Sequence, residues 1–186
     1  MSKELHTIVA LVEDRPGVLN RIVSRWRQRG FNIESLAVGH SETPGLSRMT
    51  FVVDAANNDV EQVVKQVDKL VDIVHIEDIT HLATVSRELI MIKVRSNPAS
   101  RSAILQIVDI FRANIIDVTT ESLIVEATGD EQKLDSLVEL LEEFGVIELC
   151  RTGRVAMQRG AERVGQDEPH LVLPHLHGGR APGGLF

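Results

Sequence analysis

Tyrosine is absent from this chain of 186 residues, and aromatic residues make up only 3% of it. Proteins that bind single-stranded nucleic acids stack the bases on exposed aromatic rings, so this scarcity argues against such a function. Basic residues are outnumbered as well, with 20 Lys and Arg against 27 Asp and Glu and a net charge of -7. Because a nucleic-acid backbone requires a basic surface, we expect no nucleic acid among the partners.

Cysteine and long apolar runs are scarce too. The single cysteine, Cys150, has no second cysteine to pair with, which is typical of a reducing cytoplasm. It lies in an apolar run, where we expect a small buried hydrophobic side chain rather than a reactive thiol. No apolar run approaches the ~18 residues of a membrane span, and no signal sequence precedes the first apolar segment. We therefore expect a cytoplasmic protein that does not bind membranes.

The sequence patterns of common catalytic sites are missing. The chain has no Gly-rich phosphate loop, no Ser/His/Asp order around a nucleophile turn and no Cys/His cluster at zinc spacing. The histidines of the first half are scattered and need no catalytic explanation. We therefore expect no catalytic site, metal or cofactor on this chain.

Apolar patterning divides the chain into two halves with the same order of elements. In the first half, alternation and three-to-four-residue spacing predict strand, helix, strand, strand, helix and strand. Gly30 is expected to end the first helix, because a left-handed C-terminal position favours glycine. The predicted ranges are 6–13, 17–29, 31–40, 47–54, 60–70 and 71–82.

The second half repeats this order less regularly. Strands are predicted at 89–94, 114–118, 122–128 and 146–150, with one helix capped by Ser100 or Ser102 and another starting at Gly129-Asp130. Beyond about Gly160 the pattern gives way to Pro, Gly and His. For this tail we expect disorder or an assembly arm rather than a metal site, because metal ligands need a rigid frame.

The fold class predicted from this order is α+β, with two ferredoxin-like βαββαβ domains. Each domain is expected to be an antiparallel sheet with its helices on one face, strands one and three at the centre and strand two at an edge. Along the third strand, alternation directs Met49, Phe51 and Val53 to one face and Thr50 and Val52 to the other. The predicted boundaries are 4–83, 84–160 and a tail at 161–186.

The most informative segment is the turn Asp14-Arg15-Pro16-Gly17, between the first strand and the first helix. A helix start presents unpaired N–H groups and the positive end of the helix dipole, so it attracts an anion such as a carboxylate. The N–H groups of Gly17 and Val18 are expected to face that carboxylate, because glycine has no side chain to block the approach. The carboxylate of Asp14 can take an ammonium group. These residues predict a site for a free amino acid.

Strand two is apolar for an exposed sheet edge, and such an edge must be paired or blunted. We expect it to pair with the same strand of a second copy, so that Asn32 of one subunit reaches the turn of the other. The Asn32 amide can meet both the carboxylate and the ammonium of the ligand. In an apolar pocket each methylene group of the ligand changes the binding free energy by about 1–3 kcal/mol. Such a pocket would therefore distinguish branched-chain amino acids from alanine. The expected pocket wall is Leu11, Val18, Leu19 and Ile33.

Each of these features also has a purely structural explanation. The Asp-Arg-Pro-Gly segment is a common turn into a helix, and Asn32 can cap a turn. Glu34 and Ser35 can be ordinary polar groups of an edge strand, and the Leu and Val positions can belong to the core. The combination at this spacing is what favours an amino-acid sensor.

Two segments carry a resemblance to a known family. Asp-Arg-Pro-Gly-Val-Leu at 14–19, followed by Arg-Gly-Phe-Asn-Ile-Glu-Ser-Leu at 29–36, resembles an ACT domain. More narrowly, the chain resembles the small regulatory subunit of acetohydroxyacid synthase, also called acetolactate synthase. The resemblance covers about residues 4–160 and includes the second half, which a generic ACT domain would not explain. Further matching segments are 46–50, 66–74, 87–89, 110–118 and 151–153.

This resemblance implies a noncatalytic subunit that activates a catalytic large subunit and transmits feedback inhibition by valine or a related branched-chain amino acid. Thiamine diphosphate, Mg and FAD would belong to the large subunit, which the second half would contact, while the first half forms a homodimer. Family members often have Asn in place of Asp14, and a carboxylate there should hold the ammonium more strongly. The effector contacts carried over by position are Asp14, Gly17, Val18, Asn32 and Ile33.

Two other functions stay open. The first half also permits a stand-alone ACT-domain sensor that regulates another enzyme or a transcription factor, although the resemblance of the second half disfavours it. A ferredoxin-like RNA-binding module or small enzyme is disfavoured by the acidic charge and by the lack of aromatic residues on the central strands.

Overall fold

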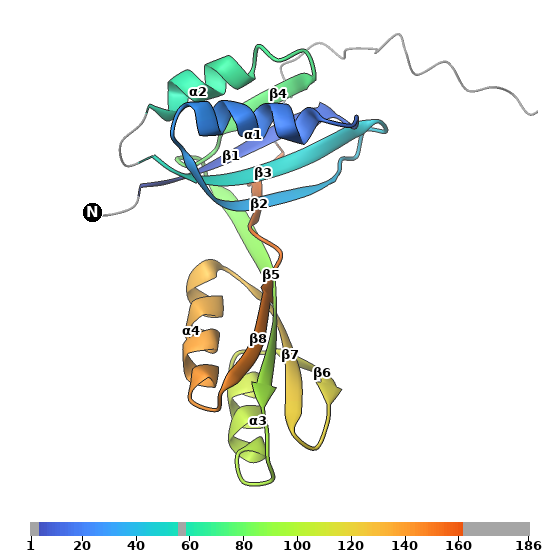
Figure 1. Cartoon of the computed structure of the whole chain (residues 1–186), viewed down its shortest axis with the longest axis vertical. Coiled ribbons are helices and arrows are strands. Elements are labelled where there is room, and N and C mark those ends of the chain that lie inside the picture. Colours follow the sequence, from blue (N-terminus) through green and yellow to red (C-terminus); the bar gives the residue numbers. More distant parts are fainter. Residues whose placement is uncertain (1–3, 56–58, 162–186) are drawn as a thin grey trace, which may run out of the picture.

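The computed structural model describes residues 4–55 and 59–161 of the protein. The described chain forms two lobes, each with an antiparallel sheet and two helices on one face of it (Figure 1). In the first lobe the strands lie in the order β2-β3-β1-β4, so β2 is an edge strand. Its elements are β1 (Leu5–Glu13), α1 (Val18–Gln28), β2 (Asn32–His40), β3 (Leu46–Asp54), α2 (Val60–Val67) and β4 (Ile73–Asp78).

The second lobe repeats this topology with the strand order β6-β7-β5-β8. A further strand, β9, pairs with the first residues of β5 rather than extending that path. The elements are β5 (Thr84–Arg95), α3 (Arg101–Ile110), β6 (Asn114–Val118), β7 (Ser122–Gly129), α4 (Glu131–Glu142), β8 (Val146–Arg151) and β9 (Val155–Gln158). The predicted α+β class with two βαββαβ units is therefore confirmed. None of the described helices has the length and apolar character needed to cross a membrane.

Two predicted elements are longer in the sequence analysis than in the structure. Helix α2 ends at Val67 instead of Leu70, because the N–H of Leu70 bonds to the carbonyl of Val67 in a tighter turn. Strand β4 covers only Ile73–Asp78 of the predicted range 71–82. It stops where the Asp78 carboxylate accepts the N–H of Thr80 and so forms a local turn.

The largest difference from the prediction is a ribbon formed by residues 84–87 of β5 and residues 155–158 of β9. The apolar pattern predicts a strand that begins only at Leu89 and no strand at residues 155–158. The β5–β9 ribbon lies on the face of the first sheet that the helices leave open: Ala156 packs with Val9 and Ile79 in a small buried cluster. Thr50 and Val52 are consequently buried, although alternation directs them away from the helices.

Cys150 is exposed, which corrects the expectation of a buried side chain. It pairs across strands with Met91, on the face of the second sheet opposite the buried Ile90 and Ile92. Alternation along β8 therefore places it away from the helices. The predicted tail lies outside the described residues, apart from residue 161.

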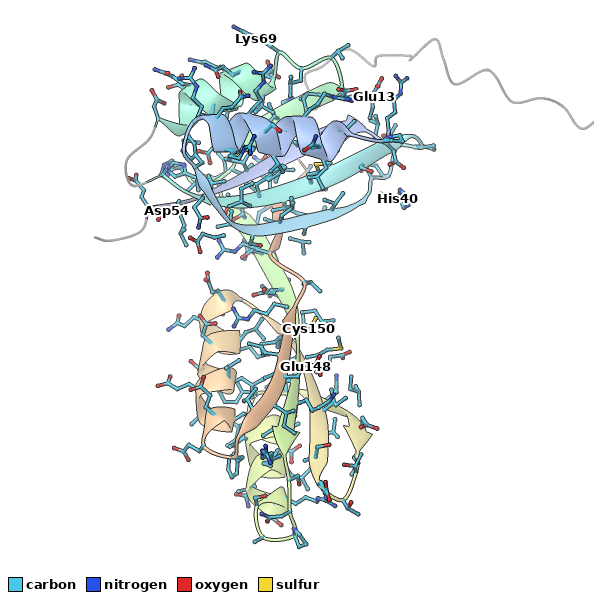
Figure 2. All side chains as sticks on the ribbon, viewed as in Figure 1. Glu13, His40, Asp54, Lys69, Glu148 and Cys150 are labelled. Carbon is cyan, nitrogen blue, oxygen red and sulfur yellow. The ribbon has the colours of Figure 1, made fainter. Side chains whose placement is uncertain are left out.

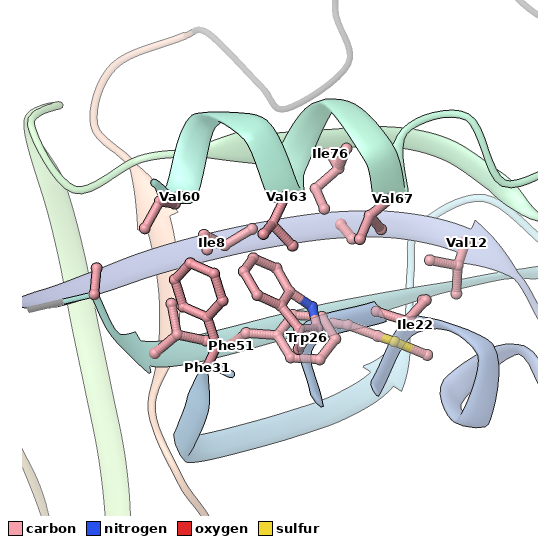
Figure 3. Packing of buried hydrophobic residues seen from close by; sticks show 14 of the residues in the cluster. Ile8, Val12, Ile22, Trp26, Phe31, Phe51, Val60, Val63, Val67 and Ile76 are labelled. Carbon is pink, nitrogen blue, oxygen red and sulfur yellow. The ribbon is translucent and has the colours of Figure 1, made fainter. Parts of the chain in front are cut away.

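The core of the first lobe is built around Trp26, the only tryptophan of the chain. Val18, Ile22 and Trp26 follow one another at four-residue spacing on α1, and all three are buried against the sheet. The Trp26 ring meets Phe31 edge to face at 5.4 Å between centroids and lies at 6.1 Å from Phe51 (Figure 3). This aromatic group fixes α1 on β3 and therefore fixes the position of the turn that precedes α1.

We expect Phe51→Ala to lower the free energy of unfolding of the first lobe by about 3–5 kcal/mol, because it leaves a cavity beside Trp26. Trp26 fluorescence during urea unfolding measures the change directly. Val71→Ala is the matched control, since Val71 is 92% exposed and its truncation should change stability by less than about 0.5 kcal/mol. Equal effects of the two substitutions would contradict the assigned core.

Candidate functional site

The turn before α1 is held in place by backbone hydrogen bonds. The N–H of Glu13 donates to the carbonyl of Asp72, and the N–H of Asp14 donates to the carbonyl of Gly45, both at 2.9 Å. Gly17 then adopts the left-handed conformation, with φ of 86°, which a glycine adopts at little cost. The turn is therefore a rigid entry into α1, as a binding site requires.

The start of α1 differs from the starts of α2 and α4. The Asp59 side chain accepts from the N–H of Gln62 at the start of α2, and Asp130 accepts from Lys133 at the start of α4. At α1 no side chain caps the helix. None of the described residues accepts a hydrogen bond from the N–H groups of Leu19 and Asn20.

The start of α3, the equivalent helix of the second lobe, has no side-chain cap either, although the turn before it is closed. The Asn97 carbonyl oxygen of the side chain accepts from the N–H groups of Ala99 and Ser100, both at 2.9 Å. Ser100 occupies the N-cap position, as predicted, but its side chain makes no capping hydrogen bond, because its Oγ accepts the N–H of Asn97 at 3.0 Å instead. Asn97 therefore closes the turn before α3, while the start of α3, like that of α1, has no side-chain cap.

Two cationic side chains add positive charge at the start of α1. The Arg21 guanidinium lies close enough to Gly17 that a Cβ added there would be 3.4 Å from Nη1. Arg21 also pairs with the buried Asp72 at 2.7 Å, which holds it in position. Arg15, half-exposed in the turn, pairs with Glu13 at 3.1 Å. Open N–H donors and guanidinium groups together favour an anionic ligand.

Asn32 and Ile33 lie at the other end of the first sheet from this turn. Asn32 pairs with Asp54 at the end of β3, whereas Glu13 pairs with Leu46 at its beginning. Figure 2 shows the consequence: Glu13 and His40 lie at one end of the first lobe and Asp54 at the other. One chain therefore brings Asp14, Gly17 and Val18 together but not Asn32 and Ile33.

The remaining predicted residues are divided between different surfaces. Leu19 is 39% exposed on α1, close in sequence to the turn. Leu11 is buried, but alternation places it on the opposite sheet face from its neighbours Ala10 and Val12, which belong to the helix-side core. Asp14 lies 3.6 Å from the Nδ1 atom of His40, the last residue of β2. The turn thus touches the end of the edge strand.

A second group of functional candidates joins the two lobes at a bulge in β2. The register of β2 against β3 shifts between Ile33 and Ser35. At this bulge Ser35 Oγ accepts the N–H of Arg154 at 2.8 Å. The Arg154 guanidinium then contacts Thr7 of β1 at 3.4 Å and pairs with Glu131, the first residue of α4. We call Ser35, Arg154 and Glu131 the lobe junction.

The sequence pattern permits Ser35 to be an ordinary polar group of an edge strand, and it does not distinguish Arg154 from other surface arginines. Gly153 was the available signal: it has a φ of 81°, and a Cβ there would lie 2.8 Å from Ser35 Oγ. The glycine allows the β8–β9 connection to lie directly against β2. A glycine next to an arginine between two strands does not by itself indicate which distant strand it approaches.

Comparison with known proteins links both lobes to one family. Residues 8–75 match the family described as AHAS small subunit-like ACT domain, and residues 87–160 match the small subunit of acetolactate synthase. The acetolactate synthase small subunit of Mycobacterium bovis is 48% identical over 165 residues, which cover 89% of this chain and 98% of that protein. The Bacillus subtilis small subunit is 46% identical over 157 residues, covering 84% and 91%.

A solved structure agrees with these sequence matches. The crystal structure of the acetolactate synthase small subunit from Thermotoga maritima superposes with a TM-score of 0.79 at 42% identity. The match covers 86% of this chain and 99% of that one. Sequence and fold therefore agree across both lobes, and not only across the first.

We expect Gly17→Ala to destabilise the first lobe by about 1–2 kcal/mol, because an L-residue is strained at a left-handed φ. Urea unfolding followed by Trp26 fluorescence is the measurement. Gly39→Ala is the control: Gly39 has no positive φ, and its added Cβ meets no atom within 4 Å. If both substitutions leave the unfolding midpoint unchanged, the conformation assigned to the turn is incorrect.

Proposed function

The chain belongs to the family of acetolactate synthase small subunits, and we propose that it is a noncatalytic regulatory subunit controlled by valine. In this proposal it activates the catalytic large subunit, which carries thiamine diphosphate, Mg and FAD, and it transmits feedback inhibition. The observation that carries the effector site is the uncapped start of α1 beside a rigid turn. We keep the cytoplasmic location predicted from the sequence as part of the proposal.

The effector site is proposed to form between two copies of this chain through β2. This strand is an edge strand that carries exposed apolar surface, with Val38 at 49%. Antiparallel pairing centred on Leu36, the middle residue of β2, sets Asn32 of the partner subunit opposite His40. Since His40 already lies 3.6 Å from Asp14, Asn32 of the partner subunit would reach the turn. Twofold symmetry then gives two equivalent sites.

The chemistry of this composite site suits a zwitterion with an apolar side chain. The carboxylate would accept from the N–H groups of Leu19 and Asn20 near Arg21, and from that of Val18 in exchange for its long bond of 3.4 Å to the Arg15 carbonyl. The ammonium would be shared by Asp14 and by Asn32 of the partner subunit. In the proposed wall, Leu19 and Ile33 of the partner subunit would contact the side chain of valine.

The lobe junction offers a physical route from this site to the second lobe, which we propose to contact the catalytic subunit. Ser35 lies three residues from Asn32 on β2, at the bulge that its hydrogen bond to Arg154 occupies. Ordering β2 against a partner strand would shift this bulge and, through Arg154, the start of α4 at Glu131. Coupling between sites typically amounts to about 1–3 kcal/mol.

The boundaries predicted from the sequence assign these roles: effector binding and dimerisation to 4–83, and contact with the catalytic subunit to 84–160. The residue ranges of the two family matches support this division. The boundary at residue 83 does not separate all contacts of the two lobes. Residues 155–158 follow the second lobe in sequence but pack on the first lobe as part of the β5–β9 ribbon.

The decisive experiment is acetolactate production by the catalytic subunit with this chain over a valine titration. We expect Gly17→Asp and Asn32→Ala to abolish valine inhibition while activation is retained, since neither residue belongs to the second lobe. Asn114→Ala is the matched control, because Asn114 begins β6 as Asn32 begins β2. Unchanged valine inhibition in both site variants would refute the site. Failure of the wild-type chain to activate, despite valine binding by calorimetry, would favour a sensor of another partner.

We expect Ser35→Ala and Arg154→Gln to weaken valine inhibition without abolishing valine binding. The expected loss of coupling is about 0.5–2 kcal/mol, measured as the difference in valine affinity with and without the catalytic subunit. Lys93→Gln is the control, since it removes an ion pair with Glu148 at 3.0 Å that lies within the second lobe. Coupling that is equal in all three variants and the wild type would exclude the lobe junction as the route.

A further inference from the structure

A cavity of about 360 Å³ lies where the β5–β9 ribbon crosses the first sheet. This volume is within the range of small-molecule sites. The cavity opens on the face of β2 and β3 opposite α1 and α2, so it is distinct from the start of α1. Its lining comes from β2, β3, β5 and β9: Ala37, Val38, Gly39, His40, Arg48, Thr50, Val85, Arg87, Val155, Ala156 and Met157.

Most of the cavity wall is aliphatic. Val85, Val155 and Met157 are between 36% and 66% exposed, although all are large apolar side chains. They come from the two strands of the ribbon, which are distant in sequence, and Ala37 adds to this wall from β2. An apolar ligand body would remove this surface from water.

Two guanidinium groups interrupt the apolar wall. Arg48 is half-buried, and its Nη2 donates to the carbonyl of Ala156 at 2.9 Å, which leaves further N–H donors. Arg87 donates to the carbonyl of Ser86 at 2.7 Å. Among the described residues, no carboxylate forms an ion pair with either of them. Burial lowers the pKa of Arg48, and the field of Glu42 opposes this only in part.

Gly39 leaves space next to Arg48. The two residues are directly opposite in the pairing of β2 with β3, so their Cα substituents point to the same face of the sheet. A Cβ at Gly39 would meet no atom within 4 Å, which means that this space is open. The cavity is thus open at the position where an anion would approach the guanidinium.

We propose that this cavity is a second ligand site, which binds an aliphatic carboxylate without an ammonium group. The carboxylate pairs with Arg48 and Arg87, and the aliphatic body lies against the valines and Met157. An amino acid is disfavoured here, because its ammonium would face two guanidinium groups. The site uses the face of β2, whereas the proposed pairing of two copies uses the edge of that strand.

A ligand in this cavity would touch both the first sheet and the ribbon. It would therefore stabilise the packing of the ribbon on the sheet, and with it the connection between the lobes. Thermal unfolding of the full chain is expected to shift to higher temperature in the presence of such a ligand.

The test is calorimetric titration of the full chain with octanoate, hexanoate, octanamide and valine. Octanoate is expected to bind about tenfold more tightly than hexanoate, because two more methylenes are buried. It is expected to bind at least about tenfold more tightly than octanamide, which lacks the charge. Valine is expected neither to displace octanoate nor to be displaced by it. Equal affinity for octanoate and octanamide, or the absence of octanoate binding, would overturn the proposal.

Two variants locate the binding. Gly39→Leu fills the open space without backbone strain and should weaken octanoate binding at least about tenfold, with thermal unfolding in the absence of ligand unchanged. Arg87→Gln should weaken it about tenfold through the lost charge. Arg27→Gln is the control, since it removes an exposed positive charge from α1 on the opposite side of the sheet. Octanoate affinity that is the same in all three variants would refute this site. If Gly39→Leu instead reduced self-association, the cavity would be an interface between copies.

Discussion

The packing of the β5–β9 ribbon on the first sheet is the contact on which the rest of the structure depends. Ala156 is 2% exposed and lies with Val9 and Ile79 under a sheet whose other face is already covered by helices. The ribbon therefore gives the first lobe a third layer, and it fixes where β5 leaves for the second lobe. Without this contact neither the lobe junction nor the cavity beside Arg48 would exist.

The two lobes share a topology and treat their helix starts alike. The second helix of each lobe is capped by an aspartate, Asp59 at α2 and Asp130 at α4. The first helices, α1 and α3, begin with no side-chain cap, and only the turn before α3 is closed by a side chain, that of Asn97. A closed cap adds stability, whereas open donors on a rigid turn can receive a ligand.

Strand β2 takes part in three separate contacts, through its edge, its bulge and one of its faces. Its hydrogen-bonding edge is open and is proposed to pair with a second copy. Its bulge at Glu34 turns Ser35 toward Arg154, which reaches both β1 and α4. Its face opposite the helices lines the cavity with Ala37 and Gly39. A change in the order or curvature of β2 would therefore alter the open edge, the contact of Ser35 with Arg154 and the cavity together.

The local pattern of the sequence determined most of the fold. The apolar stripe of α1, the alternation of β1 and β3 and the left-handed Gly30 all act over a few residues, and their order repeats in the second half. They predicted two βαββαβ units and the edge position of β2. Three features depend on contacts between distant segments, which local periodicity does not predict. They are the β5–β9 ribbon, the burial of Thr50 and Val52, and the contact of Ser35 with Arg154. The last pair is separated by 119 residues. A sequence pattern reports which faces are apolar, but only the folded chain decides which distant segment covers them.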